Sequence, residues 1–185
     1  MWNYNLYKQF RSQHISTYWT IPMIQGYVGH SKINDVELIL LTRRRWPMGG
    51  TRYNARGIDD AGNAANTVEC EQIVLKHSRK DNSKRTLQHS FTQIRGSLPF
   101  FWTQDGSKSV KIDRSLDSSL EAFCKHTSSL LLDYDSDSLL MVNLLSQQSA
   151  HEELLTTAIR KILDETAPKF KQKEQRIDYD YFDFH

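Results

Sequence analysis

The sequence predicts a mixed α/β fold with a strand-rich first half and a βαβαβ-like second half. Up to about residue 100, short apolar or alternating runs are separated by Gly, Pro and Asn, as is typical of strands. From Arg114 onward, apolar residues recur at helical spacing, and these stretches alternate with short apolar runs. Such an order of elements is expected to give a mixed β-sheet with helices packed on it.

The first half opens with two expected strands. Ile21 to Val28 is a short apolar segment, and Val36 to Thr42 is nearly continuous in its apolar residues. The second pattern is typical of a strand that is buried on both faces. Pro47, Gly49 and Gly50 then interrupt the chain, so we expect a turn or loop there.

A hairpin is expected next. Thr51 to Ile58 and Ala65 to Leu75 flank Asp59-Asp60-Ala61-Gly62-Asn63, whose Gly and Asn readily adopt positive φ. His77 to Gln88 is a charged segment that we interpret as a loop, and Ser90 to Arg95 predicts another strand. The aromatic group that follows Pro99 is expected in the core; it consists of Phe100, Phe101 and Trp102.

Two helices and two strands are expected in the second half. The first helix carries its apolar face from Leu116 to Leu131, with Ser118 and Glu121 as a possible capping box, and Leu139 to Leu145 predicts a buried strand. Ser149 and Glu152 form a clearer capping box for a second helix. Its expected apolar face contains Leu154, Leu155, Ala158, Ile159, Ile162 and Leu163. We expect a loop around Pro168 and a last strand over Arg176 to Phe184.

Composition and charge narrow the function classes. The 185 residues predict one domain, the formal net charge is +2, and 38% of the residues are hydrophobic. Residues 1–100 hold 14 Lys/Arg against 7 Asp/Glu, whereas residues 101–185 hold 10 against 15. The basic half favours an anionic partner, although a polar surface with local charge bias explains it equally well.

The cysteines and histidines predict neither a disulfide framework nor a metal site. Cys70 and Cys124 lack metal-ligand spacing, and a chain with two cysteines is more typical of a reducing, cytoplasmic compartment. No apolar run reaches the roughly 20 residues of a membrane helix, and the first residues do not resemble a signal peptide. We therefore expect no metal, no cofactor and no transmembrane segment, and the oligomeric state stays open.

Arginines are the candidate ligand-binding residues. Arg52, Arg56 and Arg95 carry planar, paired donors that match phosphate oxygens. Arg43, Arg44 and Arg45 form a basic cluster at a strand end, which is a candidate surface for acidic lipid headgroups. Two alternatives remain. The first three arginines can pair with carboxylates of the sheet (Asp59, Asp60, Glu69 and Glu71), and the cluster can be a solvated strand end.

Several blocks in order resemble the Sac-domain phosphoinositide phosphatases, a family that includes the synaptojanin-like proteins. The matching blocks span nearly the whole chain: Trp2-Asn3, Gln25-Gly26, Leu40-Leu41-Thr42-Arg43-Arg44, residues 50–72, residues 93–104, Val142-Asn143-Leu144-Leu145 and the Asp-Phe-His of 183–185. The resemblance implies hydrolysis of inositol-ring phosphates of membrane lipids through a phosphocysteine intermediate, without a metal or cofactor. It adds His185 to the candidate substrate-binding residues and implies a peripheral location at phosphoinositide-containing membranes, with no role for nucleic acid.

One feature of that family is missing from the sequence. Its nucleophile is a cysteine followed six positions later by an arginine, but Cys70 is followed there by Lys76 and Cys124 by Leu130. We therefore assign no catalytic residue. The resemblance implies that residues 1–185 are the first part of the catalytic subdomain, without the family's N-terminal subdomain and cysteine loop, so that the chain is a fragment that is inactive alone. The alternative is a non-catalytic module that binds lipid or protein.

Overall fold

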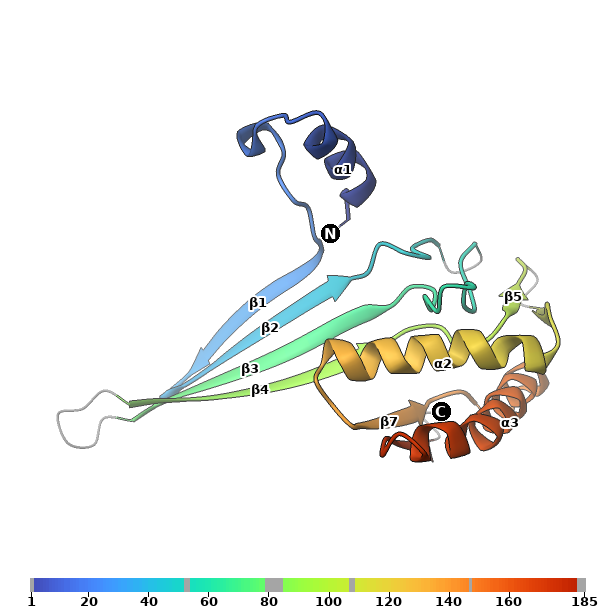
Figure 1. Ribbon diagram of the computed structural model, residues 1–185. Helices are drawn as coiled ribbons and strands as arrows, with labels where there is room; N and C mark the ends of the chain where they lie inside the picture. Colours follow the sequence, from blue (N-terminus) through green and yellow to red (C-terminus); the bar gives the residue numbers. More distant parts are fainter. Residues whose placement is uncertain (1, 52–53, 79–84, 107–108, 147, 183–185) are drawn as a thin grey trace. The chain divides into compact units, whose positions relative to one another are not determined.

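The computed structural model describes residues 2–51, 54–78, 85–106, 109–146 and 148–182. The chain divides into two compact units. Unit 1 comprises residues 1–49 and 66–96, and unit 2 comprises residues 50–65 and 97–185. The mixed α/β class is confirmed, with strands dominating the first half and long helices the second (Figure 1).

Unit 1 is built on a four-stranded antiparallel sheet. Its strands follow the chain in the order β1 (Gln25–Ile33), β2 (Val36–Arg44), β3 (Val68–Ser78) and β4 (Arg85–Arg95). A two-residue turn at Asn34, whose φ is +54°, joins β1 to β2 and pairs Ile33 with Val36. Asparagine tolerates this left-handed backbone, so the local sequence sets the register of the first hairpin.

Several boundaries in this sheet differ from the predictions. The first strand starts at Gln25 rather than Ile21, and the charged segment after His77 is shorter because β3 and β4 extend into it. The β2 residues are half-buried or exposed, so the prediction of a strand buried on both faces was wrong. A continuous apolar run places apolar side chains on both faces of a strand, but it does not specify whether other elements cover those faces.

A helix that the sequence analysis did not predict precedes the sheet. Helix α1 (Tyr4–Ser12) is tied to the segment before β1 by Asn3, whose side chain donates to the Ile21 carbonyl and accepts from the Met23 N–H, both at 2.9 Å. A short 3₁₀ turn, η1 (Thr17–Trp19), follows. No α1 residue is buried.

Unit 2 begins with the turn that the sequence predicted, but the hairpin around it was wrong. The Asp59 carboxylate accepts hydrogen bonds from the backbone of Ala61 and Asn63, and Gly62 has a φ of +87°. Among the described residues on the two sides of this turn, pairing is limited to a bridge between Ile58 and Ala64, which lies one residue before the predicted second arm. The expected second arm instead becomes β3 from residue 68, because β2 and β4 offer it continuous partners on both edges.

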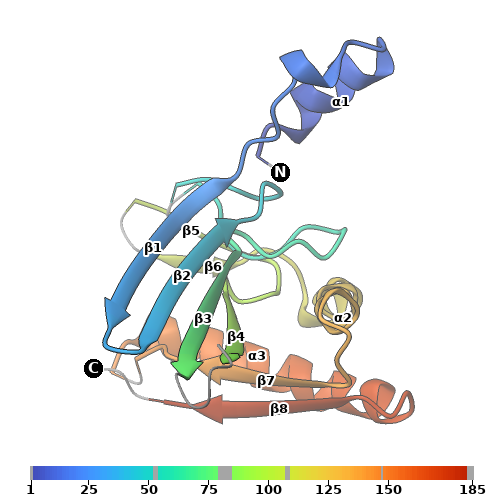
Figure 2. The ribbon, with the colours of Figure 1, turned by 90° about the vertical axis from the view of Figure 1, so that its left-hand side faces the viewer.

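The rest of unit 2 follows the order β5 (Trp102–Gln104), β6 (Val110–Ile112), α2 (Leu116–Asp133), β7 (Ser138–Asn143), α3 (Ala150–Lys171) and β8 (Arg176–Tyr181). Strands β5 and β6 form an antiparallel pair, and β7 and β8 form a separate parallel pair that α3 connects. Helix α3 lies alongside β7 and β8 (Figure 2). The second half therefore contains one complete βαβ unit.

The helix caps were partly predicted. Ser149 accepts a hydrogen bond from the Glu152 N–H, but the Glu152 carboxylate bonds the N–H of Ser146 rather than closing the capping box. The first helix is capped by Ser115 and not by Ser118. The loop expected at Pro168 was wrong, because Pro168 lies inside α3 close to its end and the helix continues to Lys171.

The core of unit 2 lies between its helices and the parallel strands. Phe100, Trp102 and Phe123 pack there with the buried face of α3, and Leu139, Met141, Ile177 and Tyr179 of the two strands cover it. Phe100, Phe101 and Trp102 are all buried, as predicted. Two predictions fail in detail: Leu154 is 44% exposed, and β7 is covered on one face only, with Leu140 exposed.

Candidate functional site

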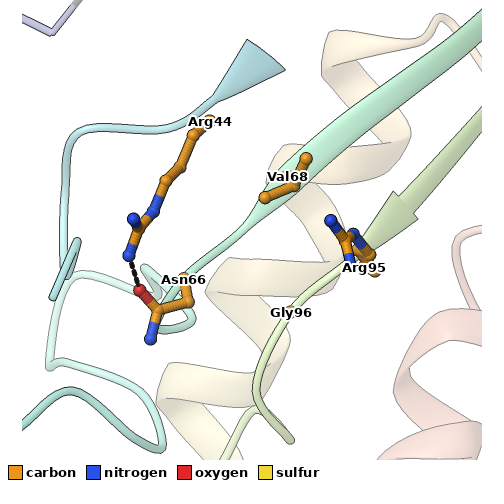
Figure 3. A pocket seen from close by; sticks show the side chains of 5 residues that line it. All are labelled: Arg44, Asn66, Val68, Arg95 and Gly96. Atoms are coloured by element: carbon orange, nitrogen blue, oxygen red, sulfur yellow. Dashed lines mark hydrogen bonds between the residues drawn. The ribbon is translucent and has the colours of Figure 1, made fainter. Parts of the chain in front are cut away.

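A pocket of about 430 Å³ lies at one end of the unit 1 sheet, where β2 and β4 end and β3 begins. It is lined by Arg44, Asn66, Val68, Arg95 and Gly96. Arg44 pairs with Val68, and Val68 pairs with Arg95, so the three residues form one row across three neighbouring strands. Figure 3 shows the two arginines on either side of Val68.

The register determines which charges share a face of the sheet. Directly opposed residues of antiparallel strands project to the same side, so Arg44 and Arg95 share a face. The carboxylates within β1 to β4 are those of Glu37, Glu69 and Glu71, and the register places all three on the opposite face. The face of the sheet that carries the two arginines therefore has no negatively charged side chain within these strands.

The carboxylates of the other face are paired with cations. Arg43 forms ion pairs with Glu69 and Glu71, the latter at 2.9 Å, and Glu37 pairs with Lys32 at 3.0 Å. Glu69 and Glu71 therefore take part in ion pairs with Arg43 of the basic cluster, a partner that the sequence analysis did not consider.

The basic cluster is divided by the alternation of the strand. Arg43 and Arg44 project to opposite faces of β2, and Arg45 follows the end of that strand with its N–H donating to the Thr67 carbonyl. The three side chains thus do not form one continuous basic surface on the sheet. The role of these residues at a membrane stays a prediction.

Arg44 is held by two neighbours in unit 1. Its Nη2 atom donates to the Asn66 side-chain oxygen, and its guanidinium lies 5.6 Å from the centroid of the Trp2 ring. A cation at that distance over an indole ring is attracted by the π face. These contacts orient the guanidinium at the pocket, and Trp2 belongs to the Trp-Asn start of the sequence pattern.

Arg95 differs from Arg44 in its surroundings. It is solvent-exposed, and among the described residues its side chain makes no hydrogen bond or ion pair. Gly96 follows it directly and contributes only backbone to the pocket. Arg95 was a candidate from sequence, whereas Asn66 and Val68 were missed because only the strand register identifies them as its neighbours.

Of the remaining candidate substrate-binding residues, the structure describes Arg56, which does not line this pocket. Arg56 lies in unit 2, where its Nη2 atom donates to Gln104 at 2.8 Å and its guanidinium lies 5.3 Å from the centroid of the Trp102 ring. Arg52 and His185 lie outside the described residues. The structure thus joins one predicted substrate-binding residue, Arg95, with one predicted membrane-facing residue, Arg44.

Neither cysteine has the surroundings of an activated nucleophile. Cys124 lies in the middle of α2, away from the N-terminus of that helix, and burial raises the pKa of its thiol despite the nearby Lys169 and Lys173. Cys70 lies within β3, and both cysteines are free and partly buried. Within the described ranges, no three His, Cys, Asp or Glu side chains are grouped as metal ligands.

Among the residues that the structure describes, no helix combines the length and the apolar character needed to cross a membrane.

Comparison with known proteins places these features in a family. The family described as "SacI homology domain" matches residues 1–185. The chain is 30% identical to Phosphatidylinositol-3-phosphatase SAC1 of Arabidopsis thaliana and 32% identical to Phosphatidylinositol-3-phosphatase SAC1-B of Danio rerio, and all of the chain is covered in both comparisons. It is 37% identical over 70% of its length to Polyphosphatidylinositol phosphatase INP53 of Saccharomyces cerevisiae.

The chain spans 21% of the length of the Arabidopsis relative, 30% of the zebrafish relative and 11% of the yeast relative. The family match nevertheless covers all 185 residues of this chain. The chain belongs to the SacI homology domain family.

Proposed function

We propose that this chain is the first part of the catalytic region of a phosphoinositide phosphatase and that it does not hydrolyse phosphoinositides by itself. The family match over residues 1–185 supports the first statement. The second is supported by the absence from the sequence of a cysteine followed six positions later by an arginine. The relatives named as phosphatidylinositol phosphatases suggest the substrate class.

Chemistry explains why that absence matters. In the phosphocysteine route, a thiolate attacks phosphorus while an arginine and backbone N–H groups bind the transferring oxygens. Burial raises the pKa of the Cys124 thiol, which opposes formation of the thiolate near neutral pH. Cys70 is located on a strand, so no helix N-terminus is available there to stabilise a thiolate.

Phosphate release is the direct test. The purified chain is incubated with vesicles that contain each phosphoinositide in turn, and free phosphate is measured by a colorimetric assay. We expect no release above the protein-free blank. Turnover that is lost in Cys70→Ser or Cys124→Ser would show that one of these thiols is a working nucleophile and would refute the proposal.

The second candidate function is a non-catalytic module that binds acidic lipid at the cytoplasmic side of a membrane. It is favoured by the charge of unit 1, whose residue ranges hold 12 Lys/Arg against 5 Asp/Glu, whereas those of unit 2 hold 12 against 17. Sequencing the transcript past the codon of His185 separates the two candidates. An open frame that reaches a cysteine loop supports the phosphatase, and an immediate stop codon supports the module.

A further inference from the structure

We propose that Arg44 and Arg95 form a non-catalytic binding site for the dianionic phosphate group of a phosphomonoester. The inference rests on the proposed function only for its preferred ligand, which is a monoester phosphate on an inositol ring. The site itself is argued from the geometry of unit 1, and binding is separable from hydrolysis.

The first argument is the spacing across the sheet. Arg44 and Arg95 are separated by one strand on either side of Val68, so their Cα atoms lie about 10 Å apart at the usual separation of neighbouring strands. Two long side chains that start at this distance on one face can both reach a ligand that lies between them. A tetrahedral phosphate has enough oxygens to accept hydrogen bonds from both guanidinium groups.

The second argument is that the four strands carry no carboxylate on the face of the two arginines. All three carboxylates of the four strands lie on the other face, where Arg43 and Lys32 pair with them. The five residues that line the pocket include two arginines and no Asp or Glu. Like charges held close together in this way repel each other, and a dianion removes that repulsion.

The third argument is preorganisation. Asn66 and the Trp2 ring already hold Arg44 in place, so less side-chain freedom is lost when that guanidinium binds a ligand. Arg95 is exposed and, within the described part of the chain, makes no hydrogen bond or ion pair through its side chain. One arginine is thus positioned in advance, and the other is available to close on the anion.

The geometry also selects the class of anion. Two arginines supply two positive charges and paired donors, which matches a monoester dianion better than the single charge of a phosphodiester or a carboxylate. The pocket is open rather than enclosed, so an inositol ring can remain outside while one of its phosphates enters.

The test measures binding to the complete 185-residue chain. Calorimetric titration compares inositol 1,4-bisphosphate, which carries monoester phosphates, with glycerophosphoinositol, which carries only a diester, and with inorganic phosphate. Arg95→Gln removes one of the two guanidinium groups. Lys76→Gln is the matched control, since it removes the same charge from the same face of the sheet. Lys76 lies on β3 roughly 26 Å from Val68 at about 3.3 Å per residue.

We expect the bisphosphate to bind and the diester not to bind measurably. Arg95→Gln should weaken binding of the bisphosphate about 10- to 100-fold, as expected for the loss of a charge-assisted hydrogen-bond pair, whereas Lys76→Gln should leave it within about twofold. Arg95→Lys should also bind more weakly than the wild type, because an ammonium group keeps the charge but not the paired donors. If Arg95→Gln fails to fold, this charge-conserving variant provides the test.

Several results would overturn the inference. The inference is wrong if the bisphosphate does not bind or if the diester binds with equal affinity. It is also wrong if Arg95→Gln and Lys76→Gln weaken binding of the bisphosphate equally, or if Arg95→Lys binds it as tightly as the wild type. Inorganic phosphate that competes at the same concentration as the bisphosphate supports the site and assigns free phosphate as its ligand. Stronger binding of the bisphosphate assigns the lipid headgroup, and vesicles containing a phosphoinositide should then bind more tightly than phosphatidylserine vesicles of equal charge. Each of these outcomes is independent of whether the chain releases phosphate.

Discussion

The buried face of α3 can be tested with two substitutions that remove the same number of carbon atoms. Ile159 is completely buried in the core of unit 2, whereas Leu154, one and a half turns earlier in the same helix, is 44% exposed. Ile159→Ala removes three carbons, which corresponds to about 2.4 kcal/mol at about 0.8 kcal/mol for each buried methylene group. The cavity adds to this value, so we expect a loss of about 3 kcal/mol in the free energy of unfolding.

Urea unfolding followed by far-UV circular dichroism measures this loss. The long helices α2 and α3 both belong to unit 2, so the helical signal reports mainly on that unit. For a slope of about 2 kcal/mol per molar urea, Ile159→Ala should lower the midpoint by about 1.5 M. Leu154→Ala should cost less than about 1 kcal/mol, because much of its side chain already contacts water.

The comparison has a clear negative outcome. Equal midpoints for the two variants would show that the buried face of α3 is rotated relative to the one described here. A loss below about 1 kcal/mol for Ile159→Ala would show that this position is not part of a close-packed core.

Three further predictions concern the backbone, the charges and the exposed surface. Gly57→Ala should destabilise unit 2 by at least about 2 kcal/mol in the same urea assay. The reason is that Gly57 has a φ of +71° and that an added Cβ would lie 2.7 Å from the carbonyl oxygens of Phe100 and Trp102. Gly106→Ala is the control and should be neutral, because a Cβ added there meets nothing within 4 Å. Hydrogen bonds from Lys32 and His30 hold the pKa of Glu37 below its ordinary value of 4.5. The contribution of the ionised Glu37 to folding stability is therefore present above pH 4.5 and is lost as the pH falls through the lowered pKa. The difference in unfolding free energy between the wild type and Glu37→Gln should shrink below about pH 4.5, and a difference that grows there would contradict the assignment. Trp19 is 83% exposed, and its neighbour Tyr18 is 91% exposed. We therefore expect light scattering to show self-association of the chain and Trp19→Ser to reduce it. A monomeric wild type would disprove this expectation.

Helical periodicity and cap residues predicted the second half of the chain well. The residues from Leu116 to Leu131 and the Ser149 cap identified both long helices, because a buried helical face requires apolar residues every three or four positions. The last turn of α3 was missed, since the prediction assumed that Pro168 would end the helix. Proline near a helix end removes only one backbone hydrogen bond, and burial of Phe170 favours continuation of the helix beyond it.

Prediction was weaker for strand partners. The turn around Gly62 was identified from local sequence, but in the part of the chain that the structure describes the two sides of this turn pair only through the bridge between Ile58 and Ala64. A strand pairs with whichever neighbours supply a continuous ladder, and those of β3 are β2 and β4. The residues of β3 and of its flanking turns do not by themselves identify its partner strands.

The sequence by itself determined the fold class and the family, and it showed that no cysteine is followed six positions later by an arginine. These features depend on residue type, order and spacing along the chain. Tertiary structure decided which arginines lie together. Arg43 and Arg44 are adjacent in sequence, yet strand alternation sends one to a pair of glutamates and brings the other to Arg95, 51 positions later. The physical reason is that a strand places successive side chains on opposite faces, while hydrogen-bonded register across neighbouring strands brings distant residues into one row.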